Sequence, residues 1–351
     1  MQLAAILLPG LAFVSQILAA VTAFDPSEHA RNHARSFEAV TNNVRQTWPI
    51  LDGSGGRNVV RYCYADAVSK AKLQQDFEAA IQIWMTALGG AASSTAEHNL
   101  VFAEVSGQGG EEKFCSAWYQ RLDQDRYTLI WDASSDHSAV IGYIPPAQLV
   151  GGKLDPPNRH HMHLSTLSGA HKIHKYAHEL GHVLALVHEH QRPDRDQHVI
   201  YRCHKVRGFS DAFQKARYDP KNDLKLADWE IENKLCNEFA FAKRYGFFGS
   251  AFDTEYGGPT QLQSFPLGDY DTKSIMHYDS LTAQTYDLND PHACPNNPAE
   301  CAIVRKGNGE PGEPIFTNLI PSAGDLAFVR TYYPYDRRPP GGGQAGNLTS
   351  T

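Results

Sequence analysis

The chain has 351 residues, of which 42% are hydrophobic and 20% are charged, and its formal net charge is -7 at pH 7. This composition is that of an ordinary globular protein, and the length suits one large domain or two modest ones. The acidic balance, without any block of basic residues, argues against a general nucleic-acid-binding protein, so we expect no nucleic-acid partner.

The N-terminus carries an apolar run over residues 3–23 that ends in Val21-Thr22-Ala23. A small residue at each end of such a triplet is typical of a signal-peptidase site, so residues 1–23 are interpreted as a signal peptide of a secreted, extracellular protein. An uncleaved membrane anchor is the alternative, because the run could just span a bilayer. Pro9, Gly10, Ser15 and Gln16 interrupt the run and weaken that alternative, whereas the lack of a preceding Lys or Arg weakens the signal peptide.

Three further segments follow from composition. Residues 24–47 are polar and weakly helical, which suggests a pro-segment or a flexible lead-in. Residues 48–336 form the main domain, and residues 337–351 have too little apolar content to fold, so we expect a disordered tail. That tail holds the single Asn-x-Ser/Thr site, Asn347-Leu-Thr349, which predicts glycosylation.

The first half of the main domain alternates strand-like and helix-like segments. β-branched and aromatic residues predict strands, and apolar residues at helical spacing predict a helix that Gly89-Gly90 ends. This order suggests one sheet with helices packed on it. The expected strands are 58–64, 100–105, 127–131, 139–144 and a short one at 161–164, and the expected helix is 67–88.

The second half is less regular. A helix begins near Ser168, a favourable N-cap residue, and carries a cluster of histidines. Further helices are expected at 210–217 and 227–244. Ser322-Ala-Gly-Asp325 resembles a capping box that opens a last helix ending at Tyr332.

Six cysteines behind a signal peptide predict three disulfides, for which fifteen pairings are possible. Two of the cysteines are close neighbours, two precede the histidine cluster and two follow it. No two cysteines lie two to four residues apart, so a cysteine-ligated metal is not expected. These positions favour Cys294 with Cys301, Cys63 with Cys115, and Cys203 with Cys236.

His178-Glu179-Leu180-Gly181-His182 has the HExxH pattern. Two histidines four residues apart on a helix project from one face, so both can bind one Zn²⁺ ion. Glu179 can then reach a metal-bound water as general base, and zinc lowers the pKa of such a water to about 7. In a chain with 17 histidines the pattern alone is only suggestive.

His188 supplies the third ligand that a catalytic zinc site needs. It lies six residues beyond His182, which is about 240° around the axis of a continuing helix. His188 can therefore bind the same ion only if the chain leaves the helix between them. The complete pattern, HExxHxxxxxH, has the metzincin spacing.

Two segments then resemble one family. Residues 178–196, HELGHVLALVHEHQRPDRD, resemble the zinc-binding signature of the astacin family of zinc metalloendopeptidases, and Ser274-Ile-Met276-His277-Tyr278 resembles the family's Met-turn. Ser322-Ala-Gly-Asp325-Leu also resembles its last helix. The resemblance is strong over about 168–196 and 270–335 and looser over 48–167.

The resemblance implies an α+β fold, namely a metzincin-type catalytic domain of two subdomains. Its N-terminal part would hold a twisted mixed sheet with two long helices, its C-terminal part would be irregular, and zinc would lie in the cleft between them. The implied function is a secreted endopeptidase that hydrolyses protein or peptide substrates with one zinc ion per chain. We expect a monomer without membrane association once the signal is removed.

The resemblance also assigns roles to single residues. His178, His182 and His188 would bind zinc, Glu179 would act as general base and acid, and Tyr278 would be a switchable zinc ligand that stabilises the transition state. Met276 would support the metal from beneath, Glu189 would hold the N-terminus of the mature chain, and the strand at 161–165 would pair with the substrate backbone.

The chain departs from the family pattern in several places. Ala185 stands where a glycine is expected, at a position whose positive φ would cost Ala about 1–2 kcal/mol. Gly169-Ala170 replaces the usual cysteine before the zinc helix, so the disulfide scheme should differ. Residues 24–50 contain neither a Phe-x-Gly-Asp inhibitory motif nor a cysteine, which leaves latency open, and an insertion around 203–236 would explain the long interval before Met276.

Other readings of the histidines and of the site stay open. His171 and His174 are expected on the helix surface, His190 and His277 as supports rather than ligands, and a second metal site at His160, His161 and His163 is not favoured. A gluzincin-type peptidase would replace His188 by Glu230, Glu232 or Glu238. A catalytically inactive binding protein with the same fold, or a structural zinc site with four protein ligands, are the remaining alternatives.

Overall fold

We describe the protein from a computed structural model. The predicted signal peptide, most of the predicted pro-segment, Ser168 and the tail with Asn347 lie outside the described residues, so these expectations stay predictions. The structure describes residues 36–38, 47–51, 53–105, 114–115, 127–132, 137–144, 159–167, 169–220, 226–254, 265–282, 293–307 and 312–335.

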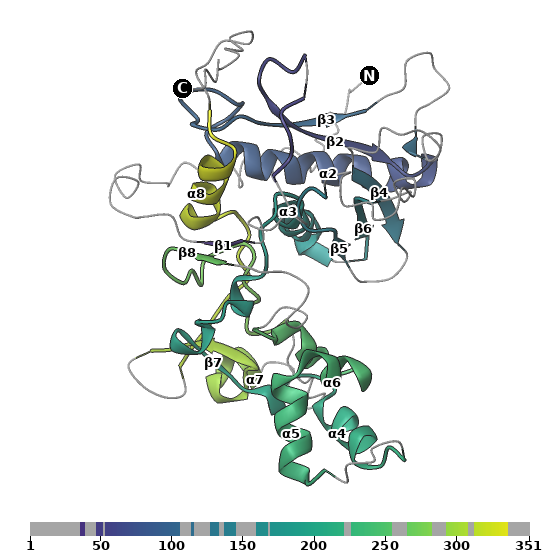
Figure 1. Ribbon diagram of the computed structural model, residues 1–351, viewed down its shortest axis with the longest axis vertical. Helices are drawn as coiled ribbons and strands as arrows, with labels where there is room; N and C mark the ends of the chain where they lie inside the picture. The colour runs from purple at the N-terminus through teal and green to yellow at the C-terminus, as the bar shows by residue number, and fades with distance from the viewer. Residues whose placement is uncertain are drawn as a thin grey trace, which may run out of the picture.

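A five-stranded mixed sheet forms the upper part of the molecule in Figure 1, in the order β3-β2-β4-β6-β5. The first four strands run parallel, and β5 is antiparallel to β6. Together with the helices, this sheet confirms the predicted α+β class. The strands are β2 (Asn58–Tyr64), β3 (Leu100–Glu104), β4 (Tyr127–Asp132), β5 (Ser138–Ala139) and β6 (His161–Ser165).

One predicted strand is much shorter than expected, and another, which is present as β6, does not lie at the expected edge of the sheet. The strand expected at 139–144 is only the two-residue β5, because the chain turns at Gly142, whose φ is 61° and whose N–H donates to the His182 carbonyl at 2.9 Å. The strand at 161–165 was expected at the substrate-binding edge, but β6 lies between β4 and β5. The edge strands of the sheet are therefore β3 and β5, and the two-residue pairing of β5 left no clear pattern in the sequence.

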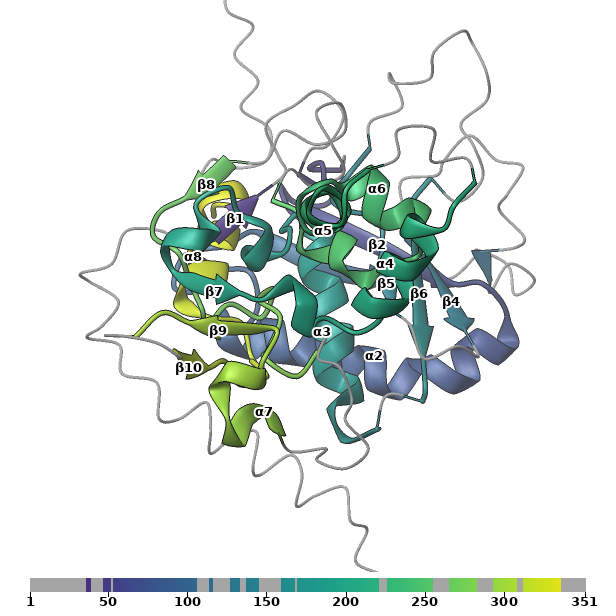
Figure 2. The same ribbon diagram turned by 90° about the horizontal axis from the view of Figure 1, so that it is seen from below.

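Two helices, α2 (Ala67–Ala87) and α3 (Lys172–Val183), pack against each other and against the sheet (Figures 1 and 2). Asp66 caps α2 by accepting a hydrogen bond from the Ser69 N–H. The indole of Trp84 joins the two helices, because its Nε1–H donates to the Ala177 carbonyl at 2.8 Å. α3 begins four residues later than expected, after a 3-10 turn over Gly169–His171.

The lower lobe in Figure 1 includes the short helices α4 (Phe209–Arg217), α5 (Asp228–Asn237), α6 (Phe239–Arg244) and α7 (Ala293–Asn296). The single helix expected over 227–244 is wrong, because Glu238 has φ −121° and ψ 106° and breaks it. The break turns the second segment, so that Ala242 of α6 joins Ile231 and Leu235 of α5 in one buried cluster.

Two small sheets were not foreseen. β7 (Val199–Tyr201), β9 (Ile303–Arg305) and β10 (Glu313–Pro314) are antiparallel neighbours (Figure 2), and β1 (Ser36–Glu38) pairs with β8 (Phe265–Leu267). Residues 36–38 are therefore extended rather than weakly helical. Strands of two or three residues that pair with distant partners leave no periodic pattern, which is why the sequence did not reveal them.

The last helix, α8 (Ala323–Tyr332), has the predicted capping box. Ser322 Oγ accepts from the Asp325 N–H, and the Asp325 carboxylate accepts from the Ser322 N–H. α8 contributes Leu326, Phe328 and Val329 to the core that α2, α3 and the sheet share. The C-terminus of the main domain thus returns to the N-terminal sheet.

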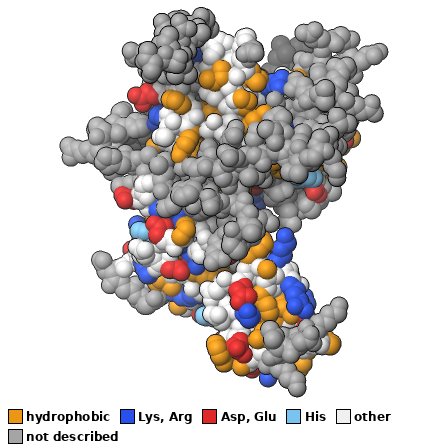
Figure 3. Space-filling model, in the orientation of Figure 1, with side chains coloured by type: hydrophobic (Ala, Val, Ile, Leu, Met, Phe, Trp, Pro, Cys, Tyr) orange, Lys and Arg blue, Asp and Glu red, His pale blue; other side chains and the backbone are white. Residues whose placement is uncertain are grey.

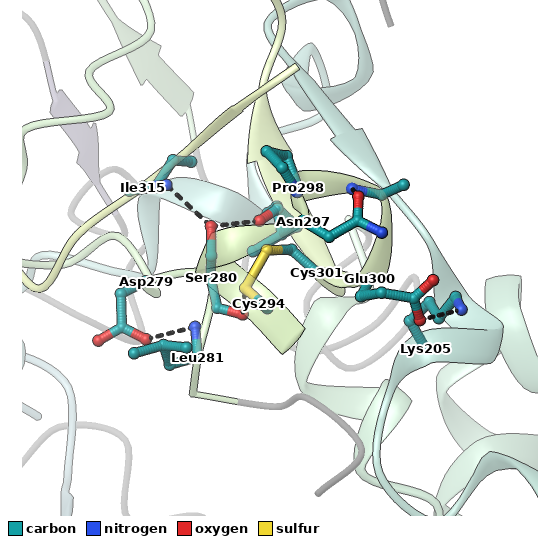
Figure 4. Close-up of a disulfide and its surroundings, with 12 residues drawn as sticks. Lys205, Asp279, Ser280, Leu281, Cys294, Asn297, Pro298, Glu300, Cys301 and Ile315 are labelled. Atoms are coloured by element: carbon teal, nitrogen blue, oxygen red, sulfur yellow. Dashed lines mark hydrogen bonds and ion pairs between the residues drawn. A yellow bond between two sulfur atoms is a disulfide. The ribbon is translucent and has the colours of Figure 1, made fainter. Parts of the chain in front are cut away.

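All three predicted disulfides are present, Cys63–Cys115, Cys203–Cys236 and Cys294–Cys301. Figure 4 shows the last of them beside Ser280. The Ser280 hydroxyl donates to the Ile303 carbonyl and accepts from the Ile315 N–H, and so joins the segment after Tyr278 to β9 and β10.

The surface of the lower lobe mixes hydrophobic, cationic and anionic side chains on the face shown in Figure 3. Trp229 of α5 and Tyr218, which follows α4, are among its exposed aromatic residues. In the described part of the chain, no helix combines the length and apolar character needed to span a membrane.

Candidate metal centre and catalytic cleft

The C-terminal end of α3 carries His178, Glu179 and His182, and the chain leaves the helix directly after it. Ala185 has φ 81°, the left-handed conformation for which the sequence pattern expects glycine, and its side chain is fully buried. Its N–H donates to the His182 carbonyl at 2.8 Å, and the next N–H, of Leu186, donates to the Gly181 carbonyl at 3.0 Å. This turn is what returns His188 to the face of the helix that carries the other two histidines.

The three imidazoles converge through their Nε2 atoms. His188 Nε2 lies 3.1 Å from His178 Nε2 and 3.2 Å from His182 Nε2. Each Nδ1 faces an acceptor, namely the Ile275 carbonyl for His178, the Leu186 carbonyl for His182 and Gln191 Oε1 for His188. Because each Nδ1 must therefore carry the proton, all three Nε2 atoms present lone pairs to one another.

Three facing lone pairs repel unless a cation lies between them. Tetrahedral coordination at a Zn–N distance of 2.0–2.1 Å would place the ligand atoms about 3.3 Å apart, close to the spacing here. Within the described ranges, these three residues form the one group of three or more His, Cys, Asp or Glu side chains that lie close enough together to hold a metal ion. The donor set therefore fits a zinc ion with an open position for water.

Burial keeps the three imidazoles in the neutral form that a metal requires. It lowers the pKa of His178, lowers that of His182 to about 3, and lowers that of His188 well below its ordinary value. Neighbouring imidazoles contribute at His182 and His188, since two cations at this distance would repel. Neutral histidines bind a cation without first losing a proton.

Glu179 lies beside this group in the cleft and is only 6% exposed. Its Oε2 has no hydrogen-bond partner among the residues that the structure describes. Burial raises the pKa of this carboxyl to about 8 in the metal-free protein. A buried carboxyl without a partner and with a pKa near neutrality suits a group that accepts and returns a proton.

The Met-turn forms the floor of the site. The Ile275 carbonyl accepts the hydrogen bond of His178, so the turn fixes one ligand directly. The turn is itself fixed by Asp325, which accepts from Ser274 Oγ at 2.7 Å and from the Ile275 N–H at 2.9 Å. The sequence marked Asp325 only as a helix cap, and its contact with the Met-turn needed the folded chain.

Gly181, the fourth residue of the HExxH segment, has a packing role that the pattern did not reveal. A Cβ atom at this position would lie 2.3 Å from Met276 Sδ and 3.5 Å from Trp84 Cζ2. The helix thus rests directly on Met276, and the absence of a side chain at Gly181 allows this close approach.

Tyr278 lies next to the third histidine. Its ring centroid is 4.7 Å from that of His188 and 4.0 Å from that of His190, on which it stacks, and Phe248 lies parallel to it at 6.4 Å. The Tyr278 side chain is half-buried and lines the cleft. The phenol is therefore held by aromatic packing beside the histidine triad.

His190 and His277 contact the Met-turn rather than the triad's Nε2 atoms. His190 donates from Nε2 to the Ala251 carbonyl and accepts the Tyr278 N–H at Nδ1. His277 lies between the Tyr278 carbonyl and the Tyr270 hydroxyl. Both imidazoles are buried and hold the backbone that carries the tyrosine.

Glu189 is buried in a charged network behind the site. Its Oε1 accepts from Arg192 at 3.2 Å and from the Asp271 N–H at 2.8 Å, whereas its Oε2 has no partner within the described ranges. Arg192 is further bound by both carboxylate oxygens of Asp194. Burial raises the pKa of Glu189 to about 8, although Arg192 and the Asp271 N–H act in the opposite direction.

A cavity of about 800 Å³ opens in front of the triad. Its walls come from both halves of the protein, with Ser138 and Ala139 of β5 on one side and Arg207 and Phe248 on the other. His171 and His174 also line it, and His174 is half-buried and hydrogen-bonded to the Leu319 carbonyl rather than simply on the surface. The histidine triad is thus open to a space large enough for an extended peptide.

The residues of the alternative metal sites, namely the gluzincin-type glutamates and the histidines at 160–163, lie outside the catalytic cleft. Glu230 caps α5 by accepting the Ala227 N–H, and Glu232 and Glu238 are exposed at α5. None of the three lines the cleft. His160 is a core residue whose Nε2 accepts the Ile144 N–H, so it is not available at this atom for a second metal.

Comparison with known proteins gives one family match. Residues 155–233, which include the histidine triad, match the model of the Astacin family (peptidase family M12A). The resemblance stated from residues 178–196 is therefore confirmed for this segment. No curated protein matches the chain.

Two solved structures show weak overall similarity to this chain. High choriolytic enzyme 1, a hatching enzyme zinc-protease from Oryzias latipes (medaka fish), is 15% identical over 82% of this chain and 94% of its own, with a TM-score of 0.42. Myroilysin is 15% identical over 86% of this chain and 100% of its own, with a TM-score of 0.38. At these values the family match over residues 155–233 is the informative one.

Proposed function

We propose that this chain, whose histidine segment matches the astacin family, is a secreted zinc-dependent endopeptidase that hydrolyses protein or peptide substrates. The observation that carries the proposal is the convergence of three Nε2 lone pairs at 3.1–3.2 Å beside the buried Glu179 carboxyl, whose Oε2 lacks a partner. One zinc ion per chain would be held by His178, His182 and His188. When bound, it would polarise the scissile carbonyl and acidify the attacking water.

Glu179 and Tyr278 would carry the proton transfers and the charge stabilisation. Glu179 accepts the proton of the attacking water and delivers it to the leaving amine, a shuttle that suits a carboxyl whose pKa lies near neutrality. The Tyr278 hydroxyl donates to the oxyanion that develops on the substrate carbonyl. The position of the Tyr278 ring, stacked on His190 and next to His188, supports this role.

The substrate would bind along β5. β5 is the edge strand that lines the cleft, and an extended peptide can add to such an edge by main-chain hydrogen bonds. This assignment replaces the expectation for residues 161–165. The facing wall, with Arg207 and Phe248, would contact substrate side chains.

Glu189 would hold the N-terminal amine of the mature chain, as the family resemblance implies. Its unpartnered Oε2 supports this proposal, because an ammonium group would supply the missing donor. The proposal includes removal of the signal peptide at residues 1–23 and of a pro-segment within 24–47. Three disulfides support secretion, since such bonds persist in oxidising compartments. We propose that the mature protein acts as a monomer.

The variant Glu179→Gln tests the mechanism. We expect it to bind zinc as the parent does but to lose about 100-fold to 10,000-fold in kcat/KM, because the amide cannot accept the proton. A fluorogenic peptide assay, with zinc content measured by atomic emission, gives both quantities. Parental activity in a zinc-loaded Glu179→Gln preparation would show that another group is the base.

The alternative function is a catalytically inactive binding protein, which the strained backbone of Ala185 favours and which an activity assay can test. Casein hydrolysis that a chelator abolishes and that zinc restores would exclude it. A structural zinc site is disfavoured, because it would need a fourth protein ligand and the grouped ligands in the described part of the chain are three.

A further inference from the structure

The three zinc-binding histidines differ in what fixes their Nδ1 atoms. His178 and His182 donate to backbone carbonyls, of Ile275 and Leu186, which no substitution removes. His188 donates to a side chain, Gln191 Oε1, at 2.9 Å. Of the three groups that accept hydrogen bonds from the Nδ1 atoms, Gln191 is therefore the one that a substitution can remove.

His188 also depends more on this partner than the other two ligands do. His178 and His182 are held by the backbone of α3, whereas His188 stands in extended conformation (φ −65°, ψ 125°) just before the 3-10 turn Glu189–Gln191. The direction of its ring must come from side-chain contacts. Gln191 is 4% exposed, so water does not readily replace it.

The orientation of the Gln191 amide is fixed by its second contact. Gln191 Nε2 donates at 3.4 Å to the backbone carbonyl of Asp253, which follows the 3-10 helix η8 (Phe248–Phe252). A carbonyl can only accept, so the NH₂ group must face Asp253 and the amide oxygen must face His188. The reversed amide would donate to Nδ1, place the ring proton on Nε2 and remove the lone pair that binds a metal.

We propose that Gln191 is a positioning residue that holds His188 in the zinc-binding tautomer and orientation, with the Asp253 carbonyl as the group that orients Gln191. The inference rests on the zinc site of the proposed function, and it concerns zinc binding rather than peptide cleavage. It connects the third ligand to the loop at Phe248–Asp253, which also carries the Phe248 side chain in the cleft wall.

Two substitutions separate this role from a merely structural one. Gln191→Leu removes the acceptor for His188, and Gln191→Glu keeps an acceptor there, while both lose the donor to Asp253. We expect the zinc Kd of Gln191→Leu to rise about 10-fold to 100-fold, the range for loss of an outer partner of a ligand histidine. We expect the zinc Kd of Gln191→Glu to stay within threefold of the parent or to fall, since a carboxylate accepts the Nδ1–H more strongly.

The measurement is competition between the full-length, metal-free protein and a chromophoric chelator for added Zn²⁺, without substrate. Gln74→Leu is the matched control, because Gln74 bonds to Glu78 on an exposed face of α2 and should leave the zinc Kd unchanged. Urea unfolding of each metal-free variant checks that the fold persists, and Gln191→Ala serves as a second acceptor-free variant if Gln191→Leu does not fold.

Zinc affinity of the acceptor-free variant within threefold of the parent would overturn the proposal. Equal weakening by Gln191→Leu and Gln191→Glu would also overturn it, because the contact with Asp253 would then be the one that matters. If the parent itself failed to bind zinc, the proposed function would fail first. A parent that binds zinc and cleaves peptide, with an unaffected Gln191→Leu, would refute only the role of Gln191.

Discussion

Ala185 stores backbone strain at the turn between the second and third histidines. At φ 81° its Cβ crowds the following carbonyl, at a cost of about 1–2 kcal/mol relative to a relaxed conformation. The buried methyl group offsets part of this cost, because a buried CH₂-sized group contributes about 0.8 kcal/mol. These opposing effects explain how an alanine is compatible with the turn that His188 requires.

Ala185→Gly should therefore change the free energy of unfolding by less than about 1 kcal/mol, because relief of strain and loss of the methyl nearly cancel. Ala185→Val should cost about 2 kcal/mol or more, since a β-branched side chain tolerates positive φ poorly. Urea unfolding of the zinc-loaded proteins measures both. A Val variant as stable as the parent would mean that the turn does not adopt this conformation.

Tyr278 combines a polar hydroxyl with a ring that aromatic neighbours hold. Tyr278→Phe keeps the stacking on His190 and removes only the hydroxyl. We expect kcat to fall about 100-fold with KM nearly unchanged, because the lost donor stabilises the charge of the transition state. Steady-state kinetics on a peptide substrate measure this fall in kcat. A kcat within twofold of the parent would show that the Tyr278 hydroxyl takes no part in the mechanism.

At the scale of elements, α3 is fixed from beneath by the Met-turn and from the side by α2. Met276 Sδ occupies the space that a side chain at Gly181 would need, and Trp84 holds the Ala177 carbonyl. Asp325, at the start of α8, fixes the Met-turn through its hydrogen bonds with Ser274 and Ile275. The geometry of the zinc ligands therefore depends on a chain of contacts between four separate segments.

Gly181→Ala should cost about 1–3 kcal/mol in the free energy of unfolding, because the new Cβ forces Met276 aside. The cost should shrink when Met276→Ala is combined with it, which a double-mutant cycle would measure. Gly307→Ala is the control, since the nearest atom to a Cβ there is Glu313 Oε1 at 3.7 Å. Additive effects of the Gly181 and Met276 substitutions would contradict this contact.

At the scale of the whole molecule, two cores meet at the cleft. One core joins the sheet, α2, α3 and α8, and the other joins α4, α5, α6 and β7. Ionisable groups buried at this junction make the stability of the metal-free protein depend on pH. Glu179 is the clearest case, because burial alone raises its pKa from 4.5 to about 8.

Between pH 4.5 and 8 an unfolded chain has ionised Glu179 while the native chain keeps it protonated. The native state then binds more protons, so the free energy of unfolding falls as pH rises, by about 1.4 kcal/mol per pH unit from this group. Metal-free Glu179→Gln lacks this dependence. Between pH 5 and pH 7 we therefore expect the difference in free energy of unfolding between the variant and the parent to shift by about 1–3 kcal/mol in favour of the variant. Urea unfolding of chelator-treated proteins tests this, and parallel pH dependences would show that Glu179 is ionised when buried.

The sequence by itself determined which residues are the candidates for the chemistry of this protein. His178 and His182 are four residues apart, and helical geometry fixes their common face without knowledge of the fold. The capping box at Ser322, the strands β2, β3 and β4, and the helix α2 also follow from local pattern. The sequence left fifteen disulfide pairings possible, and the three favoured from order along the chain are those of the structure.

Only the tertiary structure decided which residues support that chemistry. The contact of Asp325 with the Met-turn spans 51 residues, and the contact of Gln191 with Asp253 spans 62, so neither leaves a periodic signal. β5 is short because the chain turns at Gly142, whose N–H binds the His182 carbonyl, a long-range hydrogen bond that no local propensity encodes. Ligand identity is a property of side-chain type and spacing, whereas ligand orientation depends on contacts that form only when distant segments pack.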